Sequence, residues 1–484
     1  MNCKSFFLGI LVSSLCFLSS CADTHETVVP VESIMLDKEM LLIEENKDAQ
    51  FIVTIEPSDA TDRRIEWTSE DGSVATVSKE GVLTALKPGK TTVTAIAKGG
   101  GDAVSCDVYV AKGKPSSGSE PAAKRTVLAY VVADNSLAAL AKSDLEEMKR
   151  GMASVVSDLM HLLVYVDMGG GARLIEISSQ NGVGVEKTIK TYPDRNSTGI
   201  AETLEVFGDV FANEQYKSES YGLIYWSHCD GWIPYPVPST RWIGQDTGNN
   251  SDNRMNLSDF VQIMEYAPRF DFLMFDACFM QSVEVAYELR NYTDYYIASP
   301  TETPGPGAPY DKVIPYMFMY DAIVKMAEVY FDAYNSIYNG GSGISNTNWT
   351  GGVSICVLNT ARLEQLAAVT RQVLLPGDTS GLRSSVFDYD RRSGSGHIGY
   401  YDMVAMMQHL TDPTGFTEWK QVYDAAVAYW NTTPMNYSAF ARMFSMEGSN
   451  GVSHYIPASN KPAARNAYEK TGWYQAAGLS KLGW

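Results

Sequence analysis

Short apolar runs that alternate with segments of helical spacing dominate the chain beyond Arg125. The runs are rich in Val, Ile and Leu and have the length of strands buried on both faces. The expected strands are residues 126–132, 162–166, 174–177, 222–226 and 270–275, and the expected helices are residues 137–152, 257–267 and 280–290. This alternation predicts an α/β unit over residues 126–484, with a mostly parallel sheet flanked by helices.

Residues 31–111 have a different pattern, which predicts an all-β unit. β-branched runs at 51–55, 65–68, 74–77 and 91–96 are separated by turn residues such as Lys87-Pro88-Gly89-Lys90. Short strands at this spacing favour a β-sandwich. The strings 65–69 and 88–95 resemble the group 2 bacterial immunoglobulin-like domain, which implies an Ig-like spacer or adhesion module. Residues 112–125 are predicted to be a linker, because most of them are polar, Pro, Gly or Ser.

The first 20 residues have the layout of a signal peptide. Lys4 precedes two apolar runs, 6–12 and 15–18, which together are short for a membrane span. The string Leu18-Ser19-Ser20-Cys21 resembles the bacterial lipobox, which implies cleavage before Cys21 and lipidation of its sulfur. We therefore expect a lipid-anchored protein of the cell envelope, in the outer membrane or on the cell surface. An ordinary secretory peptide is the alternative.

Charge and cysteine content narrow the possible partners. The formal net charge of −19 repels phosphate backbones, so nucleic-acid binding is not expected. Four cysteines remain beyond Cys21, at positions 106, 229, 278 and 356. They are too few for a disulfide framework and lack the C-x-x-C spacing of structural zinc sites. No required cofactor is predicted.

A histidine and a cysteine follow two of the expected strands. His228 comes after 222–226 and Cys278 after 270–275, 50 residues further on, which is the caspase-type spacing. Catalytic groups of open α/β sheets collect at the carboxyl ends of the strands. A neighbouring imidazole can turn the thiol into a nucleophile and later protonate the leaving amine. The backbone amides of Cys278 and of a residue near 229 are candidate oxyanion donors. Taken singly, an inert cysteine and an ordinary histidine remain alternatives.

From about Thr126 to the C-terminus the chain resembles the clostripain family of cysteine peptidases. The matching strings include Ser227-His228 with Gly231-Trp232, Phe275-Asp276-Ala277-Cys278-Phe279-Met280, and Ser299-Pro300-Thr301-Glu302-Thr303. The resemblance implies that His228 and Cys278 form a catalytic dyad, and that a protein or peptide substrate is cleaved after Arg or Lys.

The resemblance also implies that Asp276, two residues before the nucleophile, lines the specificity (S1) pocket. Residues i and i+2 of a strand share a face, so Asp276 can accompany Cys278 into a cleft. A carboxylate there would pair with Arg bidentately and with Lys as a point charge. Glu302 is a weaker candidate for the same pocket, and Asp276 could instead cap the next helix.

One departure from the family pattern leaves a second function open. Cys229 follows the histidine where the family usually has glycine, and a side chain there would hinder the oxyanion site or form a disulfide with the nucleophile. The alternative is therefore an impaired peptidase scaffold that acts as a binding or adhesion protein. A zinc site on His228, Cys229 and Cys278 is a third hypothesis.

Two further predictions concern the segment after the histidine. Arg241 is a candidate for self-processing, because family members commonly mature by cleavage after a basic residue in this loop. Residues 246–253 are oxygen-rich and could hold Ca²⁺, which some members of the family use, although they lack EF-hand spacing. A solvated loop is the alternative.

Overall fold

The computed structural model describes residues 28–111, 123–155, 157–233, 242–248, 251–319, 321–377 and 379–484. The signal peptide with Cys21, residues 112–122 of the linker, and Arg241 lie outside the described residues, so the predictions made for them stay predictions. Within the described ranges no helix is both long enough and apolar enough to cross a bilayer.

The N-terminal unit is all-β, as predicted. Its strands form a four-stranded sheet (β2-β9-β8-β5), a three-stranded sheet (β3-β7-β6) and a pair (β1-β4). Alternate residues of the long strand β8 are buried, and the sheets enclose a core that includes Leu83, Val93, Cys106 and Val108. The strands are β1 Ser33–Leu36, β2 Met40–Glu44, β3 Asp48–Gln50, β4 Val53–Glu56, β5 Ile65–Ser69, β6 Ala75–Val77, β7 Val82–Ala85, β8 Gly89–Ala97 and β9 Val104–Ala111.

The second unit is built on a nine-stranded sheet in the order β13-β12-β11-β10-β14-β17-β18-β19-β21. The five central strands, β11 to β18 in this order, are parallel, and the pairs outside them are antiparallel. The strands are β10 Ala123–Val132, β11 Met160–Asp167, β12 Ala172–Gln180, β13 Val183–Thr191, β14 Ser218–Trp226, β17 Phe270–Asp276, β18 Thr293–Ala298, β19 Ser354–Asn359 and β21 Val427–Thr432. The predicted fold class, a mostly parallel sheet flanked by helices, is confirmed.

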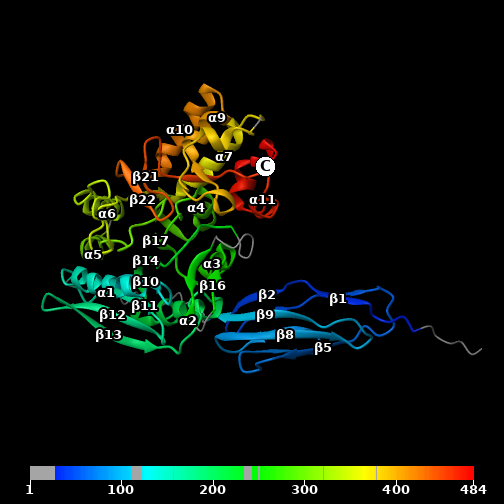
Figure 1. Cartoon of the computed structure of the whole chain (residues 1–484). Coiled ribbons are helices and arrows are strands. Elements are labelled where there is room, and N and C mark those ends of the chain that lie inside the picture. Colours follow the sequence, from blue (N-terminus) through cyan, green and yellow to red (C-terminus); the bar gives the residue numbers. More distant parts are fainter. Residues whose placement is uncertain are drawn as a thin grey trace, which may run out of the picture.

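Helices cover both faces of this sheet (Figure 1). One buried cluster contains residues of α1, α5 and α6, and the other contains residues of α2, α3, α4, α7, α9 and α10. The longer helices are α1 Ala138–Met152, α2 Ile200–Phe211, α3 Leu257–Met264, α4 Val283–Leu289, α5 Tyr310–Met317, α6 Ile323–Asn335, α7 Leu363–Val373, α9 Met403–Leu410 and α10 Pro413–Ala426. The remaining elements are α8 Leu382–Ser385, α11 Pro462–Tyr468, α12 Gly472–Ala477 and the pairs β15 Ile243–Asp246 with β16 Asn253–Met255, β20 Tyr400–Asp402 with β24 Ser453–Tyr455, and β22 Met435–Ser438 with β23 Arg442–Ser445.

Several boundaries differ from the sequence prediction, and two of these differences have a clear local contact behind them. Strand β10 begins at Ala123, inside the predicted linker, because Arg125 is buried and donates hydrogen bonds to Ser220 Oγ and Met317 O, both at 2.8 Å. Helix α4 begins at Val283 rather than at residue 280, because the Ser282 side chain accepts a hydrogen bond from Val285 N and caps the helix.

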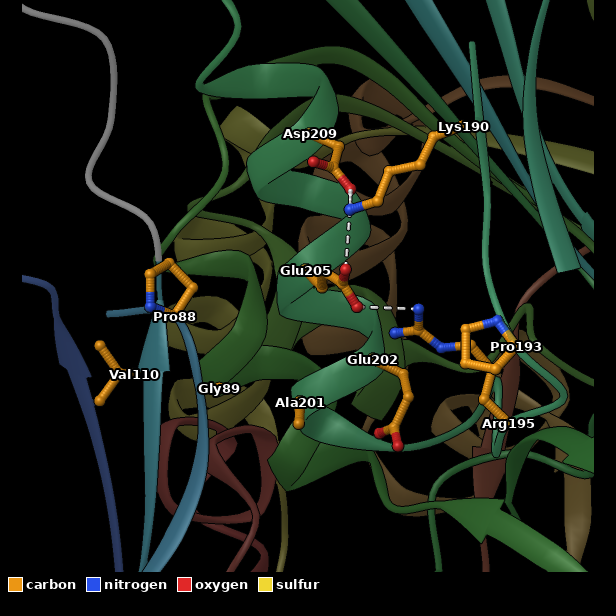
Figure 2. Close-up of a pocket in the computed structure, with 10 residues that line it drawn as sticks. All are labelled: Pro88, Gly89, Val110, Lys190, Pro193, Arg195, Ala201, Glu202, Glu205 and Asp209. Carbon is orange, nitrogen blue, oxygen red and sulfur yellow. Dashed lines mark hydrogen bonds and ion pairs between the residues drawn. The ribbon is translucent and has the colours of Figure 1, made fainter. Parts of the chain in front are cut away.

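The two units meet where β8 and β9 pack against α2. Ala111 at the end of β9 is buried in the same apolar cluster as the core of the second unit. Beside this contact lies a cavity of about 570 Å³ lined by Pro88, Gly89 and Val110 of the first unit and by residues of α2 (Figure 2). Lys190 bridges Glu205 and Asp209 there, at 2.7 and 2.6 Å, so the charges in this cavity largely pair with one another.

Candidate active site

A cleft of about 350 Å³ opens at the carboxyl ends of β14 and β17. These strands are hydrogen-bonded neighbours, and Trp226 is the register partner of Asp276. Two residues beyond this pair come His228, after the end of β14, and Cys278, after the end of β17, and both line the cleft. The predicted convergence of the imidazole and the thiol on one cavity is therefore seen. The lining residues are Ser136, Leu137, Leu140, Trp226, Ser227, His228, Asp276, Cys278, Glu302, Thr303, Pro304, Gly305, Gly307, Asn346, Trp349, Tyr437 and Ala439.

The end of β10 and the segment that follows it hold the imidazole of His228 in place. Ser227 donates a hydrogen bond from Oγ to Val132 O at 2.8 Å, which fixes the backbone next to the histidine. His228 Nε2 lies 2.9 Å from Ser136 Oγ, in the segment between β10 and α1. Burial lowers the pKa of His228 below its usual value, so the ring is neutral at neutral pH.

The thiol of Cys278 contacts the loop that follows β18. Thr303 N–H donates to Cys278 Sγ at 3.4 Å, and Thr303 Oγ1 lies 3.6 Å from the sulfur. Burial raises the pKa of Cys278 to about 12, and the charge of Glu302 adds to the rise. The resting site thus contains a neutral thiol and a neutral imidazole, and hydrogen bonds between catalytic groups commonly tighten only when substrate binds.

The residue after the nucleophile has an unusual backbone conformation. Phe279 adopts a positive φ of 59°, which costs free energy for a bulky residue and marks a sharp turn. Phe279 N donates to Thr301 O at 3.0 Å, which ties the turn to the next loop. The guanidinium of Arg392 lies 4.8 Å from the Phe279 ring centroid and pairs with Asp230 at 2.6 Å. One arginine therefore connects the turn beside Cys278 to the segment beside His228.

Cys229 does not adopt the conformation that raised doubt about it. Its φ is not among the positive values, and it lies in an isolated antiparallel bridge opposite Ile243. Its sulfur is buried in the core and accepts a hydrogen bond from Gly244 N at 3.4 Å. The side chain at this position is therefore accommodated without backbone strain, and both Cys229 and Cys278 are free thiols.

The structure bears on the proposed zinc site but not on the proposed calcium site. Across the described ranges, which include His228, Cys229 and Cys278, no group of three or more His, Cys, Asp or Glu residues could hold a metal ion. The zinc hypothesis is wrong, because Cys229 points into the core and is absent from the cleft lining. The calcium hypothesis stays open, since residues 249 and 250 of the stretch 246–253 lie outside the described part of the chain.

Asp276 supplies a buried carboxyl group in the wall of the cleft. It is 4% exposed, and its Oδ2 accepts hydrogen bonds from Ala308 N and Tyr310 Oη, both at 2.8 Å. Tyr330 Oη lies 3.4 Å from Oδ1. Burial raises the pKa of Asp276 to about 6, and the three donors oppose the rise. The group is therefore largely ionised at neutral pH, and it does not cap the following helix, which Ser282 does.

Glu302, the weaker pocket candidate, also lines the cleft. Its Oε1 accepts a hydrogen bond from Ala439 N at 3.0 Å. Burial raises its pKa, while hydrogen bonds from Ser438 and Ala439 and the charge of Arg392 lower it.

Three contacts were not predicted from the sequence: Ser136 on His228, Thr303 on Cys278, and Arg392 on both motifs. Thr303 belongs to the string 299–303 that resembles the clostripain family, and Ser136 stands a few residues after the expected strand 126–132, but neither position showed that the side chain would contact a catalytic residue. Arg392 follows Cys278 by more than a hundred residues and shows no motif.

Comparisons with known proteins show which families the two units match. The pattern of the Clostripain family matches residues 129–483, and that of the bacterial Ig-like domain (group 2) matches residues 30–108. The chain is 44% identical to a secreted C11 cysteine protease of Bacteroides thetaiotaomicron solved with an irreversible peptide inhibitor, with a TM-score of 0.69, over 74% of this chain and 100% of that one. It is 27% identical to an inactive zymogen C11 protease of Parabacteroides distasonis, with a TM-score of 0.63, over 73% and 98%.

A curated relative, the clostripain of Hathewaya histolytica, is 27% identical over 221 residues. That match covers 39% of this chain and 41% of the relative, so the chain spans less than half the length of that protein.

Proposed function

The chain belongs to the clostripain family of cysteine proteases, and we propose that it is an endopeptidase that cleaves after Arg, with Lys also accepted. The observation that carries the proposal is the meeting of His228, Cys278 and the buried carboxylate of Asp276 in one cleft. The solved relative with a peptide inhibitor supports a peptide as the ligand of this cleft.

In the proposed reaction His228 removes the proton from Cys278 as the sulfur attacks the scissile carbonyl carbon. The carbonyl oxygen becomes an oxyanion, which accepts hydrogen bonds from the backbone N–H of Cys278 and of Cys229. The C–N bond then breaks, the imidazolium protonates the leaving amine, and a thioester remains on Cys278. Water, deprotonated by His228, hydrolyses the thioester and regenerates the thiol.

Specificity for a basic side chain is assigned to Asp276, with Glu302 as a second carboxylate. A planar guanidinium can form paired hydrogen bonds with a carboxylate, whereas an ammonium acts as a point charge. Desolvation in the cleft strengthens this attraction, because the Asp276 carboxylate is largely removed from water.

The setting of the enzyme is also proposed. A lipid on Cys21 would tether it to the cell envelope, and the Ig-like unit would hold the protease domain away from the membrane. Cleavage after Arg241 would mature the enzyme, and N-terminal sequencing of active protein would reveal the new end. An intact single chain with full activity would refute that step. Calcium is proposed only as an optional ligand. Peptidase activity that persists in the presence of EDTA would agree with this.

A fluorogenic peptide ending in Arg tests the proposed activity. We expect hydrolysis by the wild type and its loss in both Cys278→Ala and His228→Ala. His409→Ala is a matched control, since His409 is exposed on α9. A protein that remains inactive after trypsin nicking and reduction would instead support the binding-scaffold hypothesis.

A further inference from the structure

A further carboxyl group, contributed by helix α1, lies in a cavity next to the cleft. Asp144 is 3% exposed and lies on the buried side of its helix, with Ala141, Leu145 and Met148. Its Oδ2 atom is buried and has no hydrogen-bond partner. Buried carboxylate oxygens are normally satisfied, so an unpartnered one points to a missing ligand.

Asp144 and Asp276 face the same small space beneath Gly307. A Cβ atom placed on Gly307 would lie 2.9 Å from Oδ2 of each aspartate and 3.1 Å from Trp226 Nε1. Gly307 has a positive φ of 73°, which suits glycine. The Oδ2 atoms of both aspartates therefore lie within 2.9 Å of one point beside Gly307, so they are close enough to each other for one guanidinium to contact both.

This space adjoins the catalytic cleft. Trp226, Asp276 and Gly307 line the cleft itself, and Asp144 lines a neighbouring cavity of about 650 Å³. Leu140, Asn346 and Trp349 line both, so the two hollows share a wall. Asp276 therefore lies in the wall of the cleft, and Asp144 lies in the adjoining cavity.

We propose that Asp144 is a further carboxylate of the specificity pocket, in addition to Asp276 and Glu302, and that together with Asp276 it makes the enzyme prefer Arg to Lys. The inference rests on the proposed function and goes beyond it, because it names the residue that sets the preference. A guanidinium has five N–H donors in a planar fork and can bind carboxylates on two of its edges at once. A Lys ammonium is a compact charge, and Asp276 alone satisfies it.

The electrostatics of the site fit a cationic ligand. Burial raises the pKa of Asp144 to about 9, the charges of Asp276 and Glu147 add to the rise, and a hydrogen bond from Trp226 opposes it. The phenols that also face the site belong to Tyr310, Tyr330 and Tyr334, and burial keeps them neutral. A guanidinium between the two aspartates favours the ionised form of Asp144. Binding of Arg should therefore release a proton from Asp144.

The test compares kcat/KM for two fluorogenic peptides that differ only in a terminal Arg or Lys. We expect Asp144→Asn to lower the Arg/Lys ratio of kcat/KM on the order of tenfold, because one charge-assisted hydrogen bond to the substrate is lost. Most of this change should be a lower kcat/KM for the Arg peptide. Glu146→Gln is the control, because it removes a carboxylate from the exposed side of the same helix. An unchanged ratio in an active Asp144→Asn enzyme would refute the inference.

A pH series gives a second readout. The Arg/Lys ratio of the wild type should rise as pH increases toward 9, while the ratio of Asp144→Asn stays flat. Both substrates use the same His228 and Cys278, so the titration of the catalytic groups cancels in the ratio. A flat wild-type ratio would contradict ionisation of Asp144 on binding.

Filling the space provides an independent variant if Asp144→Asn does not fold. Gly307→Ala should lower the Arg/Lys ratio. Gly343→Ala is the control for backbone strain, because Gly343 also has a positive φ and a Cβ placed on it would have no atom nearer than Asn348 Nδ2, at 4.0 Å. Alkylation of Cys278 by iodoacetamide reports an intact site in every variant. A wild type that is alkylated but cleaves neither substrate would refute the proposed function itself. An unchanged Arg/Lys ratio in an active Gly307→Ala enzyme would refute only the role of the region between Gly307 and the two aspartates.

Discussion

Replacing Asp276 with Asn would test whether the negative charge of this side chain is what binds the Arg side chain of the substrate. The fold should tolerate the change. The amide oxygen can take the place of Oδ2 and keep the hydrogen bonds from Ala308 N and Tyr310 Oη, and the Tyr330 hydroxyl can turn to accept from the amide nitrogen. The perturbation therefore removes a negative charge and little else.

The expected loss follows from the environment of that carboxylate. Asp276 is 4% exposed, so its pairing with a cation is poorly screened by water. Hydrogen bonds to charged groups contribute roughly 1.5–3 kcal/mol, which corresponds to a roughly 10- to 100-fold fall in kcat/KM for the Arg substrate. A peptide with neutral citrulline in place of Arg should be cleaved slowly by both proteins and at similar rates.

The assay is the Arg/citrulline ratio of kcat/KM, measured as a function of pH. The pKa of Asp276 is raised to about 6, so the charge that binds Arg is present above pH 6 and is lost as pH falls through that value. The wild-type ratio should drop there, and the Asp276→Asn ratio should be low and flat. An Asn variant that keeps the wild-type preference for Arg over citrulline would refute the role of Asp276.

Two further predictions concern other parts of the protease domain. Burial lowers the pKa of His454 from 6.5 to about 3, and its Nε2 accepts a hydrogen bond from Trp473 Nε1. As pH falls below 6.5, the free energy of unfolding of the wild type, measured with urea, should fall relative to that of His454→Gln by about 1.4 kcal/mol per pH unit, because the imidazole takes up a proton on unfolding and the other titrating groups are common to both proteins. A difference that stays constant between pH 7 and about 5 would contradict a buried neutral ring. Arg392→Ala should lower kcat on the order of tenfold with little change in KM, because it removes the pairing with Asp230 and the contact with the strained Phe279; a change confined to KM would show that Arg392 acts on substrate instead.

The sequence predicted the fold class because the strands of the central sheet are continuous apolar runs. Residues 126–132, 222–226 and 270–275 all fall within observed parallel strands, and their ends place His228 and Cys278 side by side. Strand β13 was not predicted, because it is an edge strand with mostly polar residues and no apolar run. Helix α2 carries apolar spacing that would have allowed its prediction.

The site was predictable where it depends on local strings and not where it depends on distant packing. Asp276 was predicted from the resemblance to the clostripain family, and strand geometry agreed with that prediction, because residues i and i+2 of a strand share a face. Asp144 lies on the apolar face of α1, four residues after Leu140 and four before Met148, and a carboxylate on such a face is a signal that the sequence did contain. Arg392 contacts Asp230 and Phe279 only because distant segments pack together, which no local pattern encodes.

Covalent labelling of the cleft tests the central claim most directly. An irreversible peptide inhibitor that ends in Arg should form one adduct on the intact protein, and mass spectrometry of the digest should locate it on Cys278. The adduct should be absent in Cys278→Ala and form much more slowly in His228→Ala. An adduct on Cys229, or labelling that does not depend on His228, would contradict an imidazole-activated nucleophile at residue 278.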